Sequence, residues 1–342
     1  MIVVMQVSAS EDEVSHVRRV IEARGMRALV MPGGERVAVG IPSAIPPEDR
    51  DDLAGQLGAL AGVDHVTHVT RPYKLASREF HAADTVVEIN DVRIGGGPIQ
   101  IMAGPCAVES REQILASARS ARAAGATILR GGAFKPRTSP YAFQGLQEEG
   151  LRLLRDAARE TGLLCVSEVM QPDLVGLVAE HVDVLQIGAR NMQNYPLLIE
   201  AGRSGRPILL KRGPSATLDE FLLAAEYVLH HGNPNVMLCE RGVHPLDRSY
   251  VRNTLDLNAV PVLRELSHLP VVVDPSHGIG VRRHVPAMAI AAVAAGADAL
   301  IIEMHPDPAH ALSDGAQSLD PGELAALVTR LRAVALSIGR SL

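Results

Sequence analysis

The sequence is short of the features that mark secreted and membrane-spanning proteins. It has three cysteines in 342 residues, Cys106, Cys165 and Cys239, which are too few and too scattered for a disulfide framework. No apolar run approaches the ~20 residues of a membrane span. The first residues, MIVVMQVSASEDE, have no basic flank and turn acidic at once, unlike a signal peptide. These absences favour a protein of the reducing cytoplasm.

Basic charge is also in deficit. Lys and Arg together number 33 against 39 Asp and Glu, a formal net charge of −6. This balance argues against a general binder of nucleic acids or anionic membranes, so any anion site must be a local concentration of Arg and Lys. With 47% hydrophobic and 21% charged residues, the chain has an ordinary globular composition and is long enough for a large domain and a small one.

Residues 1–70 are expected to form the small domain. Strand-like segments occur at residues 2–7, 26–31, 36–41 and 63–69. Helices begin at Ser10, where Glu13 completes a capping box, and at Pro47, while Pro32-Gly33-Gly34 is typical of a turn. The order βαββαβ is that of a ferredoxin-like domain, a type that more often binds a partner or regulator than catalyses. Residues 71–98 read as a polar connector and a β-hairpin that turns at Asn90-Asp91.

From residue 99 to 342 apolar strands alternate with helices. The apolar runs are 99–103, 126–129, 163–166, 182–187, 207–210, 235–238, 270–273 and 299–302. Amphipathic segments of helical period lie between them, for example 111–124, 146–161, 218–231 and 285–295. Near-continuous apolar strands indicate a parallel sheet covered on both faces. Eight such units fit a closed (β/α)8 TIM barrel; an open doubly wound sheet would normally bring G-x-G-x-x-G after its first strand, where this chain has AGPCAVES.

Chemistry in such barrels gathers at the C-terminal ends of the strands. The residues at these positions are Gly104-Pro105-Cys106, Arg130 with Lys135, Ser167-Glu168, Gln186 with Gly188-Ala189-Arg190, Lys211-Arg212-Gly213, Glu240-Arg241-Gly242, Asp274-Pro275-Ser276-His277 and Glu303-Met304-His305, followed by Asp314. Six cations share this rim: Arg130, Lys135, Arg137, Arg190, Lys211 and Arg241. Each alone reads equally well as a surface residue, but together they predict a phosphate and carboxylate site.

A metal site is the second chemistry at the rim. Cys106, His277, Glu303 and Asp314 offer a thiolate, an imidazole and two carboxylates, a set suited to a divalent transition metal. No spacing motif joins them, and from the residues alone a structural Cys106 and a helix-capping Asp314 are the better reading. His305 competes with His277 as the imidazole ligand, and His244 is a remoter candidate.

The sequence resembles the 3-deoxy-D-arabino-heptulosonate 7-phosphate (DAHP) synthase family, in its type I-beta subgroup with an N-terminal ferredoxin-like domain. Its motifs, in order, are AGPCAVES, LRGGAFKPRTSPY, QIGARNMQN, LLKRG, CERG, RNTLD, DPSHGIG and EMHPDPAHALSDGAQSL. The resemblance implies a cytoplasmic transferase that condenses phosphoenolpyruvate with erythrose 4-phosphate and water and releases phosphate, the first step of aromatic amino-acid biosynthesis (the shikimate pathway).

The resemblance also implies roles for single residues. Phosphoenolpyruvate would be held by Arg130, Lys135, Gln186, Gly188, Ala189, Arg190, Lys211 and Arg241. Erythrose 4-phosphate would be held by Pro136, Arg137, Thr138, Ser139 and Asp274. One divalent ion (Mn, Fe, Co, Zn or similar) would be bound by Cys106, His277, Glu303 and Asp314. The catalytic candidates are Lys135 as proton donor, His277, and either Glu168 or Asp274 to manage the water.

Two further expectations accompany the family. A tyrosine or phenylalanine effector would act at residues 1–70, and the chain would be a homo-oligomer, with a tetramer favoured. The rival within the superfamily is 3-deoxy-D-manno-octulosonate 8-phosphate synthase, which takes arabinose 5-phosphate and carries a K-A-N-R-type segment where this chain has Lys135-Pro136-Arg137-Thr138. A barrel that has lost catalysis and serves as a regulatory subunit is the alternative from another class. One departure is visible: Val243-His244-Pro245 stand where the family has isoleucine, arginine and threonine.

Overall fold

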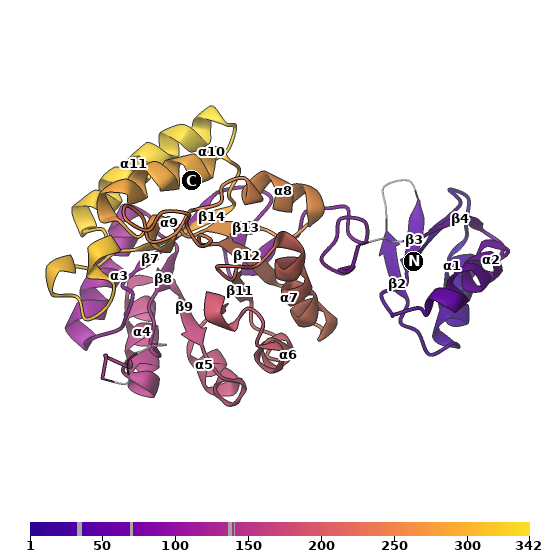
Figure 1. Cartoon of the computed structure of the whole chain (residues 1–342), viewed down its shortest axis with the longest axis horizontal. Coiled ribbons are helices and arrows are strands. Elements are labelled where there is room, and N and C mark those ends of the chain that lie inside the picture. The colour runs from indigo at the N-terminus through magenta and orange to yellow at the C-terminus, as the bar shows by residue number, and fades with distance from the viewer. Residues whose placement is uncertain (33–35, 69–70, 136–138, 140) are drawn as a thin grey trace. The chain divides into compact units, whose positions relative to one another are not determined.

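The protein folds into two compact units, Met1–Ala83 and Asp84–Leu342, as seen in a computed structural model (Figure 1). The structure describes residues 1–32, 36–68, 71–135, 139 and 141–342. Gly33, Gly34 and Val69, at the ends of expected elements, lie outside the described residues. Across the described part of the chain, no helix has both the length and the apolar character needed to cross a membrane.

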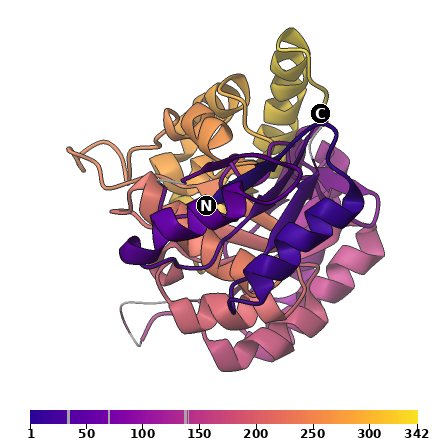
Figure 2. The same ribbon diagram turned by 90° about the vertical axis from the view of Figure 1, so that its right-hand side faces the viewer.

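The first unit contains a four-stranded sheet with two helices on one face (Figures 1 and 2). Its elements are β1 (Ile2–Met5), α1 (Glu11–Glu22), β2 (Leu29–Pro32), β3 (Val37–Gly40), α2 (Arg50–Gly58) and β4 (Val63–Thr67). The sheet order β2-β3-β1-β4 is antiparallel throughout, and this order confirms the ferredoxin-like prediction. The predicted capping box is present, with Ser10 Oγ accepting from Glu13 N while Glu13 bonds back to Ser10 N.

Residues 71–83 pack within the first unit, although their sequence reads as a polar connector. Tyr73 and Phe80 are buried, and a Cβ added at Gly40 would lie 2.5 Å from the Phe80 ring. Glycine at the end of β3 therefore makes room for the aromatic ring.

Within the described residues, eight parallel strands close into a barrel in the chain order β7 to β14. They are β7 (Gln100–Gly104), β8 (Ile128–Arg130), β9 (Leu164–Val169), β10 (Val184–Ile187), β11 (Ile208–Lys211), β12 (Val236–Glu240), β13 (Val271–Val273) and β14 (Ala299–Glu303). The last strand pairs with the first, Ile302 opposite Ala103 and Glu303 opposite Gly104. The predicted (β/α)8 fold is thus confirmed, with strand ends that differ from the expected ones by at most three residues.

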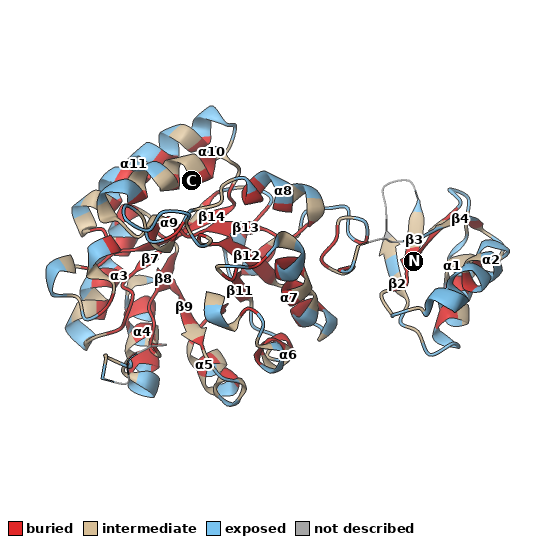
Figure 3. Cartoon of the chain, viewed as in Figure 1, coloured by how far each residue is buried: buried red, intermediate tan, exposed pale blue. Residues whose placement is uncertain are grey.

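Helices surround the strands, and burial follows the strands and the inward helix faces (Figure 3). The helices of this unit are α3 (Arg111–Ala124), α4 (Gln147–Thr161), α5 (Val175–His181), α6 (Tyr195–Arg203), α7 (Leu218–His230), α8 (Ala259–Leu266), α9 (Pro275–Ile279), α10 (Val285–Ala294) and α11 (Pro321–Ser337).

The expected hairpin is present as β5 (Val87–Ile89) and β6 (Val92–Ile94), turning at Asn90 with a φ of 53°. Its apolar residues share one core with the first residues of β8, β10 and β14. The hairpin therefore fills the end of the barrel where the strands begin, and the opposite end stays open for a site.

Candidate active site

A cavity of about 440 Å³ opens at the C-terminal ends of the barrel strands. It is lined by Arg130, Lys135, Glu168, Gln186, Gly188, Ala189, Arg190, Lys211, Pro214, Arg241, His244, Arg248, Arg252, Asn253, His277 and Asp314. Among these described residues, seven are Arg or Lys and two are carboxylates, on a chain whose net charge is −6. The cavity is therefore a local positive site on an acidic protein, as the strand-end pattern predicts.

The barrel strands carry the most deeply buried of these cations. Arg130 is the last residue of β8 and Lys211 the last of β11, and they are only 5% and 4% exposed. Arg241 follows β12; burial lowers the pKa of its guanidinium, and its Nη1 donates a long hydrogen bond of 3.4 Å to the Gly242 carbonyl. Buried Arg130 Nε has no hydrogen-bond partner among the described residues. Donors left without acceptors in a buried site are typical of a site that receives an anionic ligand.

Strand β10 and the turn after it bring an amide side chain and glycine backbone to the cavity, next to the cation Arg190. Gln186 Nε2 donates to Glu168 Oε2 at 3.3 Å. A Cβ at Gly188 would lie 2.0 Å from Glu168 Oε1, so only glycine allows the carboxylate this close to the main chain. Glu168 thus reaches the cavity wall beside Gly188 and Ala189.

Two buried ion pairs hold the cations in place. Arg130 Nη1 donates to Glu303 Oε1 at 2.7 Å, and Lys211 Nζ donates to Asp274 Oδ2 at 2.5 Å. Burial alone would raise the pKa of both carboxyls, but His277 and Arg130 hold the pKa of Glu303 at about 2, and His277 and Lys211 hold that of Asp274 well below its ordinary value. Both carboxylates are therefore ionised at neutral pH.

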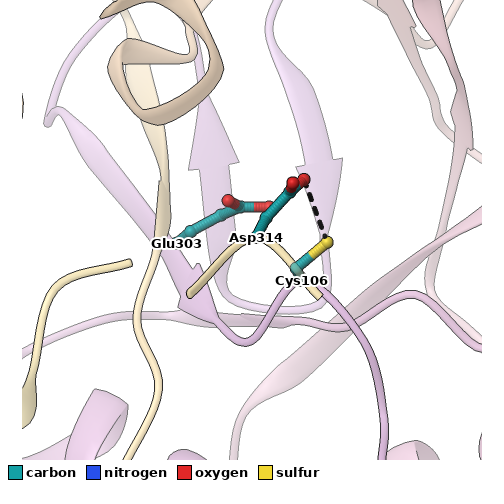
Figure 4. A group of neighbouring side chains, drawn as sticks. All are labelled: Cys106, Glu303 and Asp314. Carbon is teal, nitrogen blue, oxygen red and sulfur yellow. Dashed lines mark hydrogen bonds between the residues drawn. The ribbon is translucent and has the colours of Figure 1, made fainter. Parts of the chain in front are cut away.

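Three metal-ligating side chains converge beside these pairs (Figure 4). One ligand atom each from Cys106, Glu303 and Asp314 lies within 4.8 Å of the other two. His277 stands next to this group, with Nε2 3.4 Å from Glu303 Oε1 and 3.9 Å from Asp314 Oδ2. Sulfur, nitrogen and carboxylate oxygen together suit a divalent transition metal, so the residues present fit such an ion.

Hydrogen bonding distinguishes the three candidate histidines. His277 Nδ1 lies 2.7 Å from the ionised Asp274 carboxylate and donates to it, which leaves Nε2 facing Glu303 and Asp314. His305 has both ring nitrogens engaged elsewhere, Nε2 with Glu109 and Nδ1 with the backbone N–H of Asp307. His244 bonds to Arg248 on the cavity wall. His277 has the arrangement that a metal ligand needs.

Cys106 and Asp314 have surroundings that a purely structural role does not require. Burial raises the pKa of the Cys106 thiol to about 11, and Lys135 Nζ lies 3.0 Å from its sulfur. Asp314 precedes a 3-10 turn, Gly315–Gln317, but its side chain makes no capping bond. Its φ of 53° is a left-handed conformation, which Asp and Asn adopt more readily than other non-glycine residues.

The residues predicted for erythrose 4-phosphate are placed less completely. Pro136, Arg137 and Thr138 lie outside the described residues, and Ser139 is exposed. Asp274 is 1% exposed and is not among the described residues that line the cavity. It lies behind Lys211 and His277 and bonds to both.

Sequence reasoning missed several residues of the site. Arg248, Arg252 and Asn253 reach the cavity from the segment after β12, and Gln317 bonds to Glu303. Arg252 and Asn253 lie in the RNTLD motif and Gln317 in SDGAQSL, so their motifs were the available signal.

Comparisons with known proteins agree over the whole chain. Residues 81–336 match the model of the DAHP synthetase I family, and residues 1–71 match that of the DAHP synthase ferredoxin-like domain. A phospho-2-dehydro-3-deoxyheptonate aldolase of Thermotoga maritima is 46% identical over 339 residues, 99% of each chain. A crystal structure of the enzyme from that organism matches with a TM-score of 0.79 and 44% identity, covering 99% of this chain and 98% of the other.

Two further relatives cover less of the chain. A truncated form of the Thermotoga maritima synthase covers 79% of this chain and 98% of its own, with 46% identity and a TM-score of 0.74. A 2-dehydro-3-deoxyphosphooctonate aldolase of Caulobacter vibrioides is 36% identical over 276 residues, 73% of this chain and 94% of its own.

Proposed function

Since the chain belongs to the DAHP synthetase I family, its activity is that of a DAHP synthase, and we propose how its cavity carries out the reaction. Phosphoenolpyruvate, erythrose 4-phosphate and water combine, and phosphate is released. The observation that supports the proposal is the gathering of seven Arg and Lys side chains, among the described cavity residues, beside a group of metal-ligating atoms.

The cations overcome repulsion between the substrates. The two molecules together carry about four to five negative charges, since each phosphate monoester contributes about −1.5 to −2 and phosphoenolpyruvate also has a carboxylate. We assign phosphoenolpyruvate to Arg130, Lys135, Arg190, Lys211 and Arg241, with Gln186, Gly188 and Ala189 on the adjoining wall. We assign erythrose 4-phosphate to Pro136, Arg137, Thr138 and Ser139 on their sequence alone. Fixed cations in a site of low dielectric neutralise this charge without reorganising.

The proposed metal ligands are Cys106, His277, Glu303 and Asp314. The family is metal-dependent, and a bound divalent ion supplies Lewis-acid polarisation of the aldehyde carbonyl. Manganese, iron, cobalt or zinc would each fit this donor set. Asp274 keeps His277 in the tautomer whose Nε2 faces Glu303 and Asp314.

The remaining steps need proton transfers. C3 of phosphoenolpyruvate attacks the aldehyde, water adds at the resulting cationic C2, and the hemiketal phosphate collapses with C–O cleavage. We assign to Lys135 the transfer of a proton to the new alkoxide, and its place in the cavity lining, with Nζ 2.9 Å from the Cys106 carbonyl, supports this role. We assign the water to Glu168 rather than Asp274, because Glu168 lines the cavity while the Asp274 oxygens are bonded to Lys211 and His277.

A second candidate function is that of a 3-deoxy-D-manno-octulosonate 8-phosphate synthase, because relatives with this activity are also similar to the chain. They match less of it, and at lower identity, than the Thermotoga maritima relative does. A steady-state assay with erythrose 4-phosphate or arabinose 5-phosphate, before and after chelation and with Mn²⁺ added back, tests both. We expect turnover with erythrose 4-phosphate only, lost with the metal and regained with it. Full activity after verified metal removal would exclude the metal role, and absence of turnover with either sugar would favour the non-catalytic regulatory barrel.

For the first unit we propose binding of an aromatic amino-acid effector, tyrosine or phenylalanine. This unit contains a cavity of about 680 Å³ whose lining includes Ile45, Pro47, Arg50, Arg71 and Lys74. Cations beside apolar side chains suit the carboxylate and ring of such a ligand.

The proposed assembly is a homo-oligomer, with a tetramer favoured, which light scattering after size exclusion would test. The three unpaired cysteines fit the proposed cytoplasmic location.

A further inference from the structure

Gln317 joins two charged side chains near the metal-ligating group. Its side-chain Nε2 donates to Glu303 Oε2 at 2.5 Å, and its Oε1 accepts from Arg252 Nη1 at 2.8 Å. A carboxamide has a donor and an acceptor on one rigid plane, so it can satisfy a carboxylate and a guanidinium at once. At 2% exposed, Gln317 is not among the described residues that line the cavity, and it therefore acts through its neighbours.

Arg252 extends this connection to a second ligand. The same Nη1 that meets Gln317 lies 3.3 Å from Asp314 Oδ1. The stem of Arg252 passes close over Gly280, where an added Cβ would lie 2.2 Å from Arg252 Cβ and φ is +69°. Arg252 N also donates to the Ile279 carbonyl at 3.0 Å. The backbone of Arg252 is thus fixed against the end of α9, and this orients its guanidinium group.

The backbone of Asp314 is held by the 3-10 turn that contains Gln317, Gly315–Gln317. Its carbonyl accepts from Gln317 N at 3.2 Å and from Ser318 Oγ at 3.1 Å, while its φ stays at 53°. On the other side, Asn253 Nδ2 donates to the His277 carbonyl at 2.8 Å. Arg252 and Asn253, neighbours in one motif, are therefore connected to three of the four proposed ligands. Arg252 contacts Asp314 directly and Glu303 through Gln317, and Asn253 contacts the backbone of His277.

We propose that Gln317 and Arg252 form a positioning clamp that fixes the Glu303 and Asp314 carboxylates opposite Cys106 before the ion binds. The inference rests on the proposed metal site. Two carboxylates close together repel each other and would separate unless held, and ligands already in place lose less freedom on binding. Hydrogen-bond partners of this kind orient metal ligands, and their loss typically weakens metal binding ~10–100-fold.

The test is the affinity of the metal-free, full-length enzyme for Mn²⁺, measured by calorimetric titration of Gln317→Leu. Leucine fills similar space without either hydrogen bond, so we expect the Kd to rise about 10–100-fold. At saturating Mn²⁺ the KM for phosphoenolpyruvate should be unchanged and kcat within a few-fold of native. A raised KM with an unchanged metal Kd would overturn the clamp and make Gln317 a substrate-binding determinant.

Arg252→Met is the second variant, because the Arg252 side chain is 42% exposed and we expect its substitution to disturb folding less than a buried change. We expect a similar rise in metal Kd, partly recovered in Arg252→Lys, which restores a charged donor. The matched control is Gln100→Leu. Gln100 begins β7 at the opposite end of the barrel, where its Oε1 accepts from Thr127 Oγ1 at 2.9 Å, and its loss should leave the metal Kd unchanged.

The outcomes separate this inference from the proposed function. If the native enzyme binds no Mn²⁺, the metal site itself is wrong. If the native enzyme binds Mn²⁺ and both Gln317→Leu and Arg252→Met bind it within two-fold of the native Kd, the clamp alone is wrong.

Discussion

Arg130 Nη1 lies 2.7 Å from Glu303 Oε1 in the barrel interior, and the two side chains are 6% and 1% exposed. This one contact joins the proposed phosphoenolpyruvate site to the proposed metal site. Each side chain neutralises the charge of the other. A buried charge without a partner would destabilise the folded protein by several kcal/mol.

Arg130→Met removes that compensation from Glu303. In the metal-free enzyme we expect a loss of about 3–5 kcal/mol in the free energy of unfolding, measured by chemical denaturation. Added Mn²⁺ should recover part of the loss, because an ion at the site replaces the missing positive charge. Arg152→Met, which breaks an exposed pair with Glu148, is the control and should cost at most about 0.5 kcal/mol. Equal losses in the two variants would contradict the buried pair's importance.

Lys135→Met tests the proton donor. The side chain is 8% exposed, and methionine preserves its length without its charge. We expect kcat to fall by two or more orders of magnitude, the usual contribution of a positioned general acid, with the far-UV circular dichroism unchanged. Near-normal turnover would exclude Lys135 from the chemistry.

Asp274→Asn disturbs two residues at once, since Asp274 bonds to both Lys211 and His277 Nδ1. We expect about a 10–100-fold loss in metal affinity or kcat and a higher KM for phosphoenolpyruvate. Asp298→Asn is the matched control: Asp298 is also buried, but it pairs with Arg264 and Arg340 where β14 begins. That control should lower stability and leave both kinetic constants near native; similar kinetics in the two variants would refute the assigned role of Asp274.

Removal of residues 1–83 tests the effector proposal, because the first compact unit ends at Ala83. The remaining barrel should keep its turnover and lose any response to tyrosine or phenylalanine, while the full chain responds. Initial rates with and without each amino acid measure this. A full chain that ignores both, or a shortened one that is still inhibited, would disprove the proposal.

The fold was predictable because its signals are local. Apolar runs mark the barrel strands, and Ser10 with Glu13 marks the start of α1. The packing of Tyr73 and Phe80 in the first unit was not predictable, since their segment reads as polar and the room for Phe80 depends on Gly40, 40 residues earlier in the chain.

The site divides in the same way. Arg130, Lys211 and Glu303 end their strands, so the barrel's geometry brings them to one rim. Arg252 and Gln317 lie outside the strands, and the paths of two long segments decide where their side chains meet. No periodicity in the sequence encodes that meeting.

The pairing of β14 with β7 has a mechanical consequence. Cys106 follows the barrel's first strand, while Glu303 ends its last strand and Asp314 follows soon after. An ion shared by these side chains would link the first and last barrel strands, β7 and β14, where the sheet closes. Removal of the ion should therefore weaken the pairing of β7 with β14 more than that of the other strands. Amide hydrogen exchange should become faster in β7 and β14 first.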